Sequence, residues 1–382
     1  MHPQDYQIPS GSEMLETKPK MQLSEDQQIA FDEILHWLSD KESGQELSLG
    51  GYAGTGKTTL LKELMHEIDV NTEVMSLTGK ACSVLVKKGV DAHTIHSSIY
   101  YVHTEKKKPV FTLRQSLDEN PELLIIDEAS MVSVDLHRDL LSFGLPVLWV
   151  GDHGQLEPIG RNPGVMKNPQ LKLEKIHRQA AGNPIIMFAD KIRQGGIPAA
   201  IIPKGTSTIE MLNKRNIDED RLVEPDQIIV GLNRTRVKMN KIIRKIRGYP
   251  PMEVVPGDKI VCLKNDRRAG LFNGLQGKVV SIEADKKWPV YHVMVDLDGG
   301  RVWRGEMLME QFNKDKGLHE PDKAMWGITH WDYAYAITCH KAQGSEWPTV
   351  MVVEESAGKL WSMPRWRYTA VTRASERLLY AC

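Results

Sequence analysis

The run GYAGTGKTT, residues 51–59, is the stretch of this sequence that decides the fold. It fits the pattern G-x-x-x-x-G-K-[ST], and it stands between a strand-like segment (ELSLG) and a helix-like segment (TLLKELMHEI). Glycines allow backbone N–H groups to curl around phosphates, and the positive end of the helix dipole adds to the attraction. Lys57 would then reach the β- and γ-phosphates, and the Thr58 hydroxyl would bind Mg²⁺. An ordinary glycine-rich turn is disfavoured because strand, complete pattern and helix occur together.

Short apolar runs alternate with helical segments on both sides of this loop. Between about 46 and 150 these runs are ELSLGGY, EVMSLTG, ELLIIDEAS and VLWVGD. Buried strands separated by helices predict an α/β fold with a parallel sheet and crossover helices. A second series predicts a second α/β unit, with QIIVGLN at 227–233, WDYAYAITCHKAQG at 331–344 and TVMVVEES at 349–356.

The segment between these strands of the second unit has a different pattern. From about 256 to 310, strand-like runs are broken by Gly and Asp turns, with no helix between them. This predicts a small antiparallel β-barrel inserted in the second unit. The expected parts of the chain are a mobile tail (1–20), a first domain (21–178) with a short hairpin insertion (98–118), and a second domain (179–382) with the barrel-like insertion (256–320).

Composition excludes several classes of protein. The 382 residues carry 49 Lys and Arg against 50 Asp and Glu, a net charge of −1, and the length suits two or three domains. No run approaches the ~18 apolar residues of a membrane span, and the N-terminus lacks the apolar core of a secretory signal. The four cysteines are far apart, which disfavours a local zinc site and a disulfide scaffold. We therefore expect a cytosolic protein with no blanket affinity for nucleic acid.

Two further strand ends carry polar side chains. LLIIDEAS, residues 123–130, places Asp127 and Glu128 at the carboxyl edge of a buried strand, beside the phosphate loop. Asp127 would hold Mg²⁺ and Glu128 would polarise an attacking water. VLWVGD, residues 147–152, is followed by Gln155, whose side chain could sense a γ-phosphate. The alternatives are a solvated turn for the acidic pair and a water-facing loop residue for Gln155.

With these motifs in order, the sequence resembles superfamily 1 helicases, in the branch that contains RecD and the phage helicase Dda. LSEDQQ (23–28) resembles the Q motif, GYAGTGKTT motif I, and LTGKAC (77–82) with DAHTIHS (91–97) motif Ia and its neighbour. LLIIDEAS resembles motif II, WVGDHGQLEPIG (149–160) motif III, and LEKIHRQ (173–179) motif IV. AITCHKAQGSEW (336–347) resembles motif V and YTAVTRASERL (368–378) motif VI, so the resemblance spans residues 23–381.

The resemblance implies two RecA-like parallel-sheet domains with ATP and Mg²⁺ held between them. It implies that Gln27 reads the adenine edge, and that Arg178 and Arg373 reach the γ-phosphate as arginine fingers. The same glutamine has the spacing of a capping box with Ser24, and Arg178 could instead pair with Glu174. The residues expected at the nucleotide are Gln27, Gly51, Ala53, Gly54, Thr55, Gly56, Lys57, Thr58, Thr59, Gly344 and Glu346.

A path for DNA across both domains is also implied by the resemblance. The residues it places there are Thr78, Lys80, His96, Thr338 and His340. The basic run NRTRVKMNKIIRKIRG, 233–248, adds Arg234 and Arg236 as candidate phosphate contacts, with a plain solvated helix face as the alternative. Residues 98–118 stand where related helicases carry a strand-separating wedge, and Tyr100 and Tyr101 could stack on bases there or belong to an ordinary exposed hairpin.

The expected function is ATP-dependent unwinding of DNA with 5′-to-3′ translocation on a single strand. Single-stranded and forked DNA are the expected partners, with replication, repair or recombination proteins as further candidates and no membrane. The expected location is the cytoplasm of a bacterial or phage-infected cell. Two alternatives stay open: a non-unwinding DNA-stimulated ATPase or motor subunit of a recombination or nuclease complex, and an RNA helicase of the same superfamily.

Overall fold

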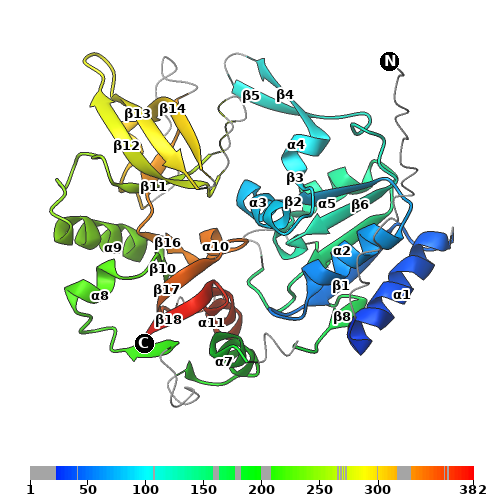
Figure 1. Cartoon of the computed structure of the whole chain (residues 1–382). Coiled ribbons are helices and arrows are strands. Elements are labelled where there is room, and N and C mark those ends of the chain that lie inside the picture. Colours follow the sequence, from blue (N-terminus) through cyan, green and yellow to red (C-terminus); the bar gives the residue numbers. More distant parts are fainter. Residues whose placement is uncertain are drawn as a thin grey trace, which may run out of the picture.

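The computed structural model describes residues 23–40, 42–105, 108–157, 163–176, 182–198, 208–264, 266, 269, 271, 273–298, 300–315, 328–356, 358 and 361–382. The tail expected at 1–20 lies outside these residues. Two α/β domains lie side by side, and a β-sheet insertion sits above the second domain (Figure 1). Among the described residues, no helix is both long enough and apolar enough to cross a bilayer.

The first domain is built on a six-stranded, entirely parallel sheet, as the alternating pattern predicts. Its strands, in spatial order, are β3 (His93–Thr94), β2 (Thr72–Ser76), β6 (Leu123–Asp127), β7 (Val147–Gly151), β1 (Glu46–Gly51) and β8 (Leu171–Leu173). Its helices are α1 (Glu25–Ser39), α2 (Lys57–Glu67), α3 (Gly79–Lys87), α4 (Ile95–Ile99) and α5 (Val134–Leu141), with a 3₁₀ turn η1 (Ala129–Met131).

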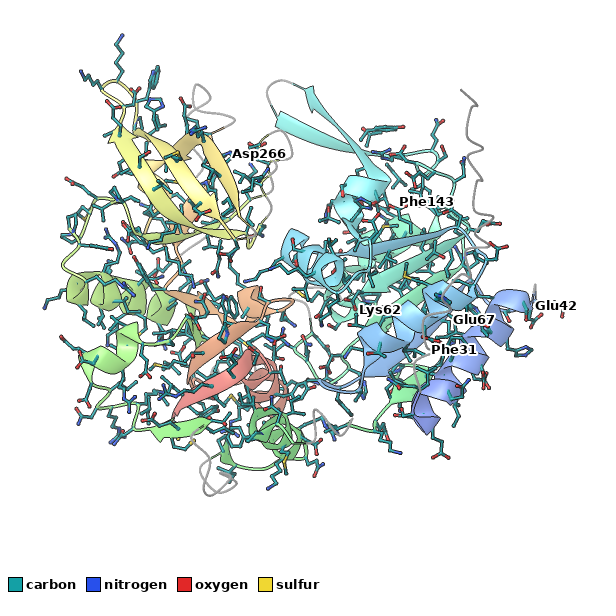
Figure 2. All side chains as sticks on the ribbon, viewed as in Figure 1. Phe31, Glu42, Lys62, Glu67, Phe143 and Asp266 are labelled. Carbon is teal, nitrogen blue, oxygen red and sulfur yellow. The ribbon has the colours of Figure 1, made fainter. Side chains whose placement is uncertain are left out.

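Alternate residues of the buried strands supply two apolar cores, one on each face of this sheet. Ile125 and Leu148 belong to the core that includes Phe31 of α1, whereas Ile126 and Trp149 belong to the core that includes Leu136 of α5. Phe31 lies where α1 and α2 meet (Figure 2). Helices on both faces bury the central strands β6, β7 and β1, which explains why these strands appear in the sequence as continuous apolar runs.

The second domain has a five-stranded parallel sheet. Its strands, in spatial order, are β16 (Ala336–Thr338), β10 (Gln227–Val230), β17 (Trp347–Val353), β18 (Ala374–Ala381) and β9 (Ile209–Leu212). Its helices are α7 (Pro184–Arg193), α8 (Glu219–Val223), α9 (Asn233–Ile246), α10 (Cys339–Ala342) and α11 (Met363–Val371). The boundary predicted at 178 falls between β8 of the first sheet and α7, which packs on α11 of the second domain.

The insertion is a five-stranded antiparallel sheet, and the prediction of a β-barrel is not confirmed. Its strands, in spatial order, are β14 (Arg301–Leu308), β13 (Val290–Leu297), β12 (Gln276–Ala284), β11 (Lys259–Cys262) and β15 (Trp331–Tyr333), and the 3₁₀ turn η3 (Met309–Gln311) follows β14. Among the described residues, an isolated bridge links Met307 of the edge strand β14 to Thr329, two residues before the other edge strand, β15. The run at 331–344 was assigned as a whole to the second α/β unit, but its first part forms β15 of the insertion, and the rest forms β16 of the parallel sheet and α10.

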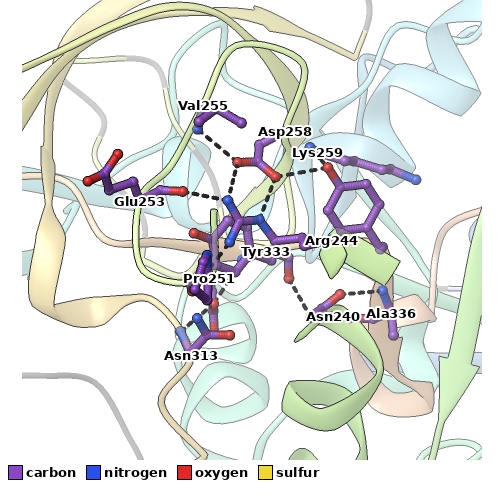
Figure 3. A network of polar contacts seen from close by, with 12 residues as sticks. Asn240, Arg244, Pro251, Glu253, Val255, Asp258, Lys259, Asn313, Tyr333 and Ala336 are labelled. Carbon is purple, nitrogen blue, oxygen red and sulfur yellow. Dashed lines mark hydrogen bonds and ion pairs between the residues drawn. The ribbon is translucent and has the colours of Figure 1, made fainter. Parts of the chain in front are cut away.

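A buried ion pair joins the insertion to the second domain (Figure 3). Arg244 of α9 donates from Nε to Asp258 Oδ1 at 2.9 Å, and the Tyr335 hydroxyl donates to the same oxygen at 2.9 Å. Asn240, one turn earlier on α9, donates to the Tyr333 carbonyl at 3.0 Å and accepts from the Ala336 N–H at 2.7 Å. Because these buried groups bond to one another across the two parts of the chain, the insertion and the second sheet are held as one unit.

Candidate nucleotide and nucleic-acid site

The phosphate loop connects β1 to α2, as its sequence predicts. Gly54 and Gly56 have φ angles of 80° and 76°, a left-handed conformation that other residues adopt only at a cost. Lys57 begins α2, and its Nζ donates to the carbonyls of Gly51 at 2.6 Å and Tyr52 at 3.1 Å. The first turn of α2 also carries the half-buried Thr58 and Thr59, and Ala53 and Thr55 complete the loop. These residues provide backbone donors, an ammonium and hydroxyls at one helix N-terminus.

Gln27 is tied to this loop in a way the capping-box spacing does not predict. The predicted capping box with Ser24 is present, and the Ser24 N–H donates to Gln27 Oε1 at 2.9 Å. The amide nitrogen donates to the carbonyls of Thr55 and Gly56, each at 3.3 Å. Gln27 is 1% exposed. Through its two bonds to Thr55 and Gly56, it anchors the start of α1 directly on the phosphate loop. Adenine recognition by this side chain stays a prediction.

Asp127 and Glu128 lie at the carboxyl end of β6, the position predicted for them. Burial raises the pKa of Asp127, although the nearby charge of Lys57 opposes this shift. Burial also raises the pKa of Glu128, and the neighbouring charge of Asp127 adds to that shift. Glu128 has a left-handed φ of 54°, and its Oε2 is buried with no hydrogen-bond partner. A strained, unpartnered carboxylate with a raised pKa has the properties of a general base.

Beyond β7, the loop 152–156 presents a second group of polar side chains. Asp152 is 2% exposed, and it accepts hydrogen bonds from the Gly154 N–H at 2.9 Å and from Gln155 Nε2 at 3.4 Å. Gln155 is 4% exposed, and its Oε1 is buried with no partner. A buried acceptor without a donor is costly, so Gln155 can accept from a water or a protonated group in the site. Burial excludes the alternative of a loop residue that faces bulk water, and sensing of a γ-phosphate by Gln155 stays a prediction.

The second domain supplies Arg373 to the same cleft. Its guanidinium is 7% exposed and donates to the carbonyls of Thr369 at 3.1 Å and Ser345 at 3.0 Å, and to Thr372 Oγ1 at 3.1 Å. Its positive charge opposes the rise in the pKa of Glu128, so the guanidinium is near enough to act on that carboxyl electrostatically. Arg178, the other predicted finger, lies outside the described residues.

Residues of motif V lie directly against the first domain. A Cβ added at Gly344 would stand 3.4 Å from both Ala81 Cβ and Thr78 Oγ1, and the glycine has a φ of 68°. Thr78 caps α3, where its hydroxyl accepts from the Ala81 N–H at 3.2 Å. Glu346 is exposed, and its predicted proximity to the ribose stays a prediction. In Figure 1, α3 and α10 accordingly face each other at the centre of the molecule.

The other residues predicted to contact DNA lie on α3, α4 and α10. Lys80 of α3 reaches across the domain boundary, with its Nζ 3.7 Å from Asp298 Oδ2, and burial lowers its pKa. Thr338 directly precedes α10, and His340 lies on α10 with its ring 6.1 Å from the ring of Trp361. Burial lowers the pKa of His340, so the imidazole is neutral at pH 7. His96 lies on α4, beside the Tyr100 ring at 5.8 Å.

The prediction that Arg236 contacts DNA is wrong. Its guanidinium is buried in an ion pair with Asp332 of β15, with Nη1 and Oδ2 2.5 Å apart. Arg244 is likewise buried against Asp258, so part of the basic run is structural. Arg234 is exposed and stays a candidate phosphate contact. The lack of acids within the run was misleading because the partners come from distant segments.

The insertion predicted at 98–118 contains a hairpin of β4 (Tyr100–Glu105) and β5 (Lys108–Leu113). Tyr100 is held at its base, where the hydroxyl donates to Asp139 Oδ2 at 2.5 Å. Tyr101 is 55% exposed, and the Arg114 guanidinium lies 4.5 Å from its ring centre. The hairpin leans toward the insertion sheet, on the side where Asp266 lies (Figure 2). Of the two tyrosines, Tyr101 is therefore the more exposed, and stacking of either ring on a base stays a prediction.

Two residues of this site were missed by sequence reasoning. Asp152 stood in the strand-end motif and Tyr368 in the last motif, but neither was given a role. Their side chains are joined by a hydrogen bond of 2.7 Å from the Tyr368 hydroxyl to Asp152 Oδ2. The sequence contains a Gly-Asp pair at a strand end and a tyrosine five residues before Arg373, but neither pattern indicates which residue the side chain contacts.

A phosphate loop, a strand-end acidic pair and a second parallel-sheet domain in contact with that loop define a two-domain P-loop protein. Residues 22–214 match the family model described as an AAA domain, and residues 333–379 match the UvrD-like helicase C-terminal domain. The chain belongs to the AAA domain family. The expected resemblance to superfamily 1 helicases of the RecD/Dda branch is confirmed.

Relatives with known names support this assignment. The chain is 30% identical over 397 residues to the ATP-dependent RecD2 DNA helicase of Deinococcus radiodurans, covering 95% of this chain and 50% of that protein. It is 30% identical over 199 residues to the ATP-dependent DNA helicase Dda of Enterobacteria phage T4, covering 45% and 43%. The chain thus spans about half the length of the RecD2 relative. The structure of Bacteroides Pif1 bound to single-stranded DNA shares the fold, with a TM-score of 0.55 at 21% identity over 95% of this chain and 92% of that one.

Proposed function

We propose that this chain is an ATP-dependent DNA helicase that translocates 5′ to 3′ on a single strand and unwinds duplex DNA. The observation that carries the proposal is that groups from both domains meet at the phosphate loop. The phosphate loop and Glu128, whose Oε2 has no partner, come from the first domain, while the second domain contacts the phosphate loop through Tyr368 and acts on Glu128 through the charge of Arg373. A hydrolysis site assembled from two domains can convert the state of the nucleotide into a relative movement of those domains.

The side chains of the cleft suit the parts that ATP hydrolysis requires. Thr58 and Asp127 would hold Mg²⁺, which supplies neutralisation of phosphate charge when bound. Glu128 takes the proton of the attacking water, and Gln155 orients that water. The two fingers, Arg178 and Arg373, neutralise charge on the γ-phosphoryl oxygens.

DNA is the proposed substrate because of what the relatives act on. RecD2 and Dda are named as DNA helicases, and solved Pif1 structures are described with single-stranded and forked DNA. In this chain, Thr78, Lys80 and Gly344 meet where the two domains approach each other, so a strand bound there would contact both. We further propose replication, repair or recombination proteins as partners, in the cytoplasm of a bacterial or phage-infected cell.

The test is strand separation by the isolated chain on duplexes with a single-stranded tail at the 5′ or at the 3′ end. Unwinding of the 5′-tailed duplex alone, lost in Lys57→Ala, is the expected result. A fold measurement on the variant, by circular dichroism, controls for misfolding. DNA-stimulated ATP hydrolysis without strand separation would support a non-unwinding motor subunit instead. Stronger stimulation by RNA than by DNA would support an RNA helicase.

A further inference from the structure

Tyr368 of α11 belongs to the second domain. In the structure, both hydrogen bonds found for its hydroxyl are to groups of the first domain. It accepts a hydrogen bond from the Ala53 N–H of the phosphate loop at 2.8 Å and donates one to Asp152 Oδ2 at 2.7 Å. A phenol has one proton, so accepting from an amide and donating to a carboxylate satisfies it without conflict. Burial, with the charge of Asp152, raises the pKa of Tyr368 well above its usual value, so the hydroxyl keeps its proton.

The ring of Tyr368 is fitted closely into the first domain. A Cβ added at Gly154 would stand 3.1 Å from Tyr368 Cε1 and equally close to the ring of Tyr52. The rings of Tyr52 and Tyr368 meet edge-on, with centroids 6.3 Å apart. On the Tyr52 ring, the Arg193 guanidinium of the second domain lies 3.8 Å from the centre. The loop glycine therefore permits a close aromatic contact across the cleft.

Neighbouring bonds hold the loop 152–156 to the second domain as well. The Leu156 N–H donates to Thr369 Oγ1 at 2.9 Å, and its carbonyl accepts from Gln343 Nε2 at 2.9 Å. Arg365 Nη1 donates to the carbonyl of Gln155 at 3.1 Å. This loop carries Gln155, so the position of that side chain depends on whether the two domains are together.

Opening the cleft would break both bonds of Tyr368 and leave the buried Asp152 carboxylate without this donor. The hydroxyl thus stands between the phosphate loop and the loop 152–156, which carries Gln155. A tyrosine present only for packing would need its ring but not its hydroxyl.

We infer that Tyr368 is a positioning residue, whose hydroxyl fixes the phosphate-loop backbone against Asp152 when the domains close and thereby couples DNA binding to ATP hydrolysis. The inference rests on the proposed function. In the closed cleft, the Ala53 N–H and the loop that bears Gln155 take up their working positions together. Without the hydroxyl, ATP still binds, but closure no longer aligns these groups.

The test compares Tyr368→Phe with the control Tyr380→Phe in the full chain. Tyr380 is a fully buried tyrosine of the same domain, and its hydroxyl donates to Glu354, so the control also removes one buried hydroxyl. Steady-state hydrolysis with saturating oligo(dT) gives kcat and the KM for ATP. Fluorescence anisotropy of a labelled oligo(dT), with and without a non-hydrolysable ATP analogue, gives the nucleotide-dependent change in DNA affinity.

We expect Tyr368→Phe to lower DNA-stimulated kcat about tenfold or more, with KM changed less than threefold and the nucleotide-dependent change in DNA affinity largely lost. Tyr380→Phe should keep kcat and that coupling. Wild-type kcat and coupling in Tyr368→Phe, or equal losses in both variants, would overturn the inference while leaving the proposed function standing. A wild-type chain without DNA-stimulated hydrolysis would overturn both.

Discussion

The ammonium of Lys80, in the first domain, lies 4.1 Å from the centre of the Trp347 ring, in the second. The same ammonium is 3.7 Å from Asp298 Oδ2, in the turn between β13 and β14 of the insertion. One side chain of α3 therefore touches both the parallel sheet and the insertion of the second domain. Because Lys80 is also predicted to lie on the DNA path, a phosphate of a bound strand would compete with Asp298 for its charge.

This competition predicts opposite effects for the two partners. Lys80→Ala should weaken binding to oligo(dT) and reduce the slope of log affinity against log salt by about 1, since one phosphate contact is lost. Asp298→Asn should strengthen binding about two- to fivefold, because the carboxylate that holds Lys80 is removed. Anisotropy titrations over a salt series measure both. Unchanged affinity in both variants would exclude Lys80 from the DNA path.

The raised pKa of Glu128 leads us to expect that the rate of ATP hydrolysis depends on pH. Its raised pKa means that the carboxylate gains its proton above pH 4.5, the usual value for glutamate, so kcat should fall as the pH is lowered through that raised value. Glu128→Gln should lower kcat at least 100-fold while ATP still binds, and its residual rate should lack this acid limb. A pH profile of single-turnover hydrolysis for the two proteins tests the assignment. The same acid limb in both would assign the titration to another group.

Two arginines of α9 are predicted to behave differently, although they are two positions apart. Arg236→Ala leaves Asp332 buried without its partner and should lower the free energy of unfolding by about 3–5 kcal/mol. Arg234→Ala removes an exposed charge and should change stability by less than about 0.5 kcal/mol, while weakening DNA binding if Arg234 contacts a phosphate. Urea unfolding of both variants makes the comparison. Equal stabilities would contradict the buried ion pair.

The local features of this fold could be predicted from the sequence, because each depends on residues that lie close together along the chain. The glycine pattern before Lys57, the apolar run that ends at Asp127 and the capping box at Ser24 are all found where they were expected. Their chemistry depends on neighbours within a few positions, so a linear pattern suffices.

The relationships that sequence did not reveal join distant residues. Arg236 and Asp332 are 96 positions apart, and Tyr368 and Asp152 are 216 apart. A single sequence contains no sign that such residues meet, so a basic run was taken for a DNA contact and a tyrosine was given no role. The division of 331–344 between two sheets was missed for a related reason, since its apolar residues suit either sheet.

We expect substitution of Gln27 to lower both the stability of the protein and its affinity for ATP. Gln27→Ala removes the capping bond at Ser24 and the two bonds to the phosphate loop, which should cost about 1–3 kcal/mol of stability and raise the KM for ATP. The adjacent Gln28→Ala is a matched control. The Gln28 side chain is exposed, and the hydrogen bond found for it is to Asp32, within α1. Thermal unfolding and ATP titration of both variants check this. A KM unchanged in Gln27→Ala would show that the anchoring of the loop does not matter for binding.

Arg373 is the last and most direct test of the cleft. Its guanidinium is held by three bonds within the second domain, so its position is fixed before any nucleotide binds. Arg373→Ala should reduce hydrolysis about 10³-fold or more and spare ATP binding, because an arginine finger acts on charge that develops at the γ-phosphoryl group. Arg373→Lys should recover little of that rate, since an ammonium cannot make the paired contacts of the planar guanidinium. Single-turnover hydrolysis measures the rate, and titration with a fluorescent ATP analogue measures binding. Full recovery by lysine would reduce the role of Arg373 to its charge, and a normal rate in the alanine variant would remove Arg373 from the catalytic site.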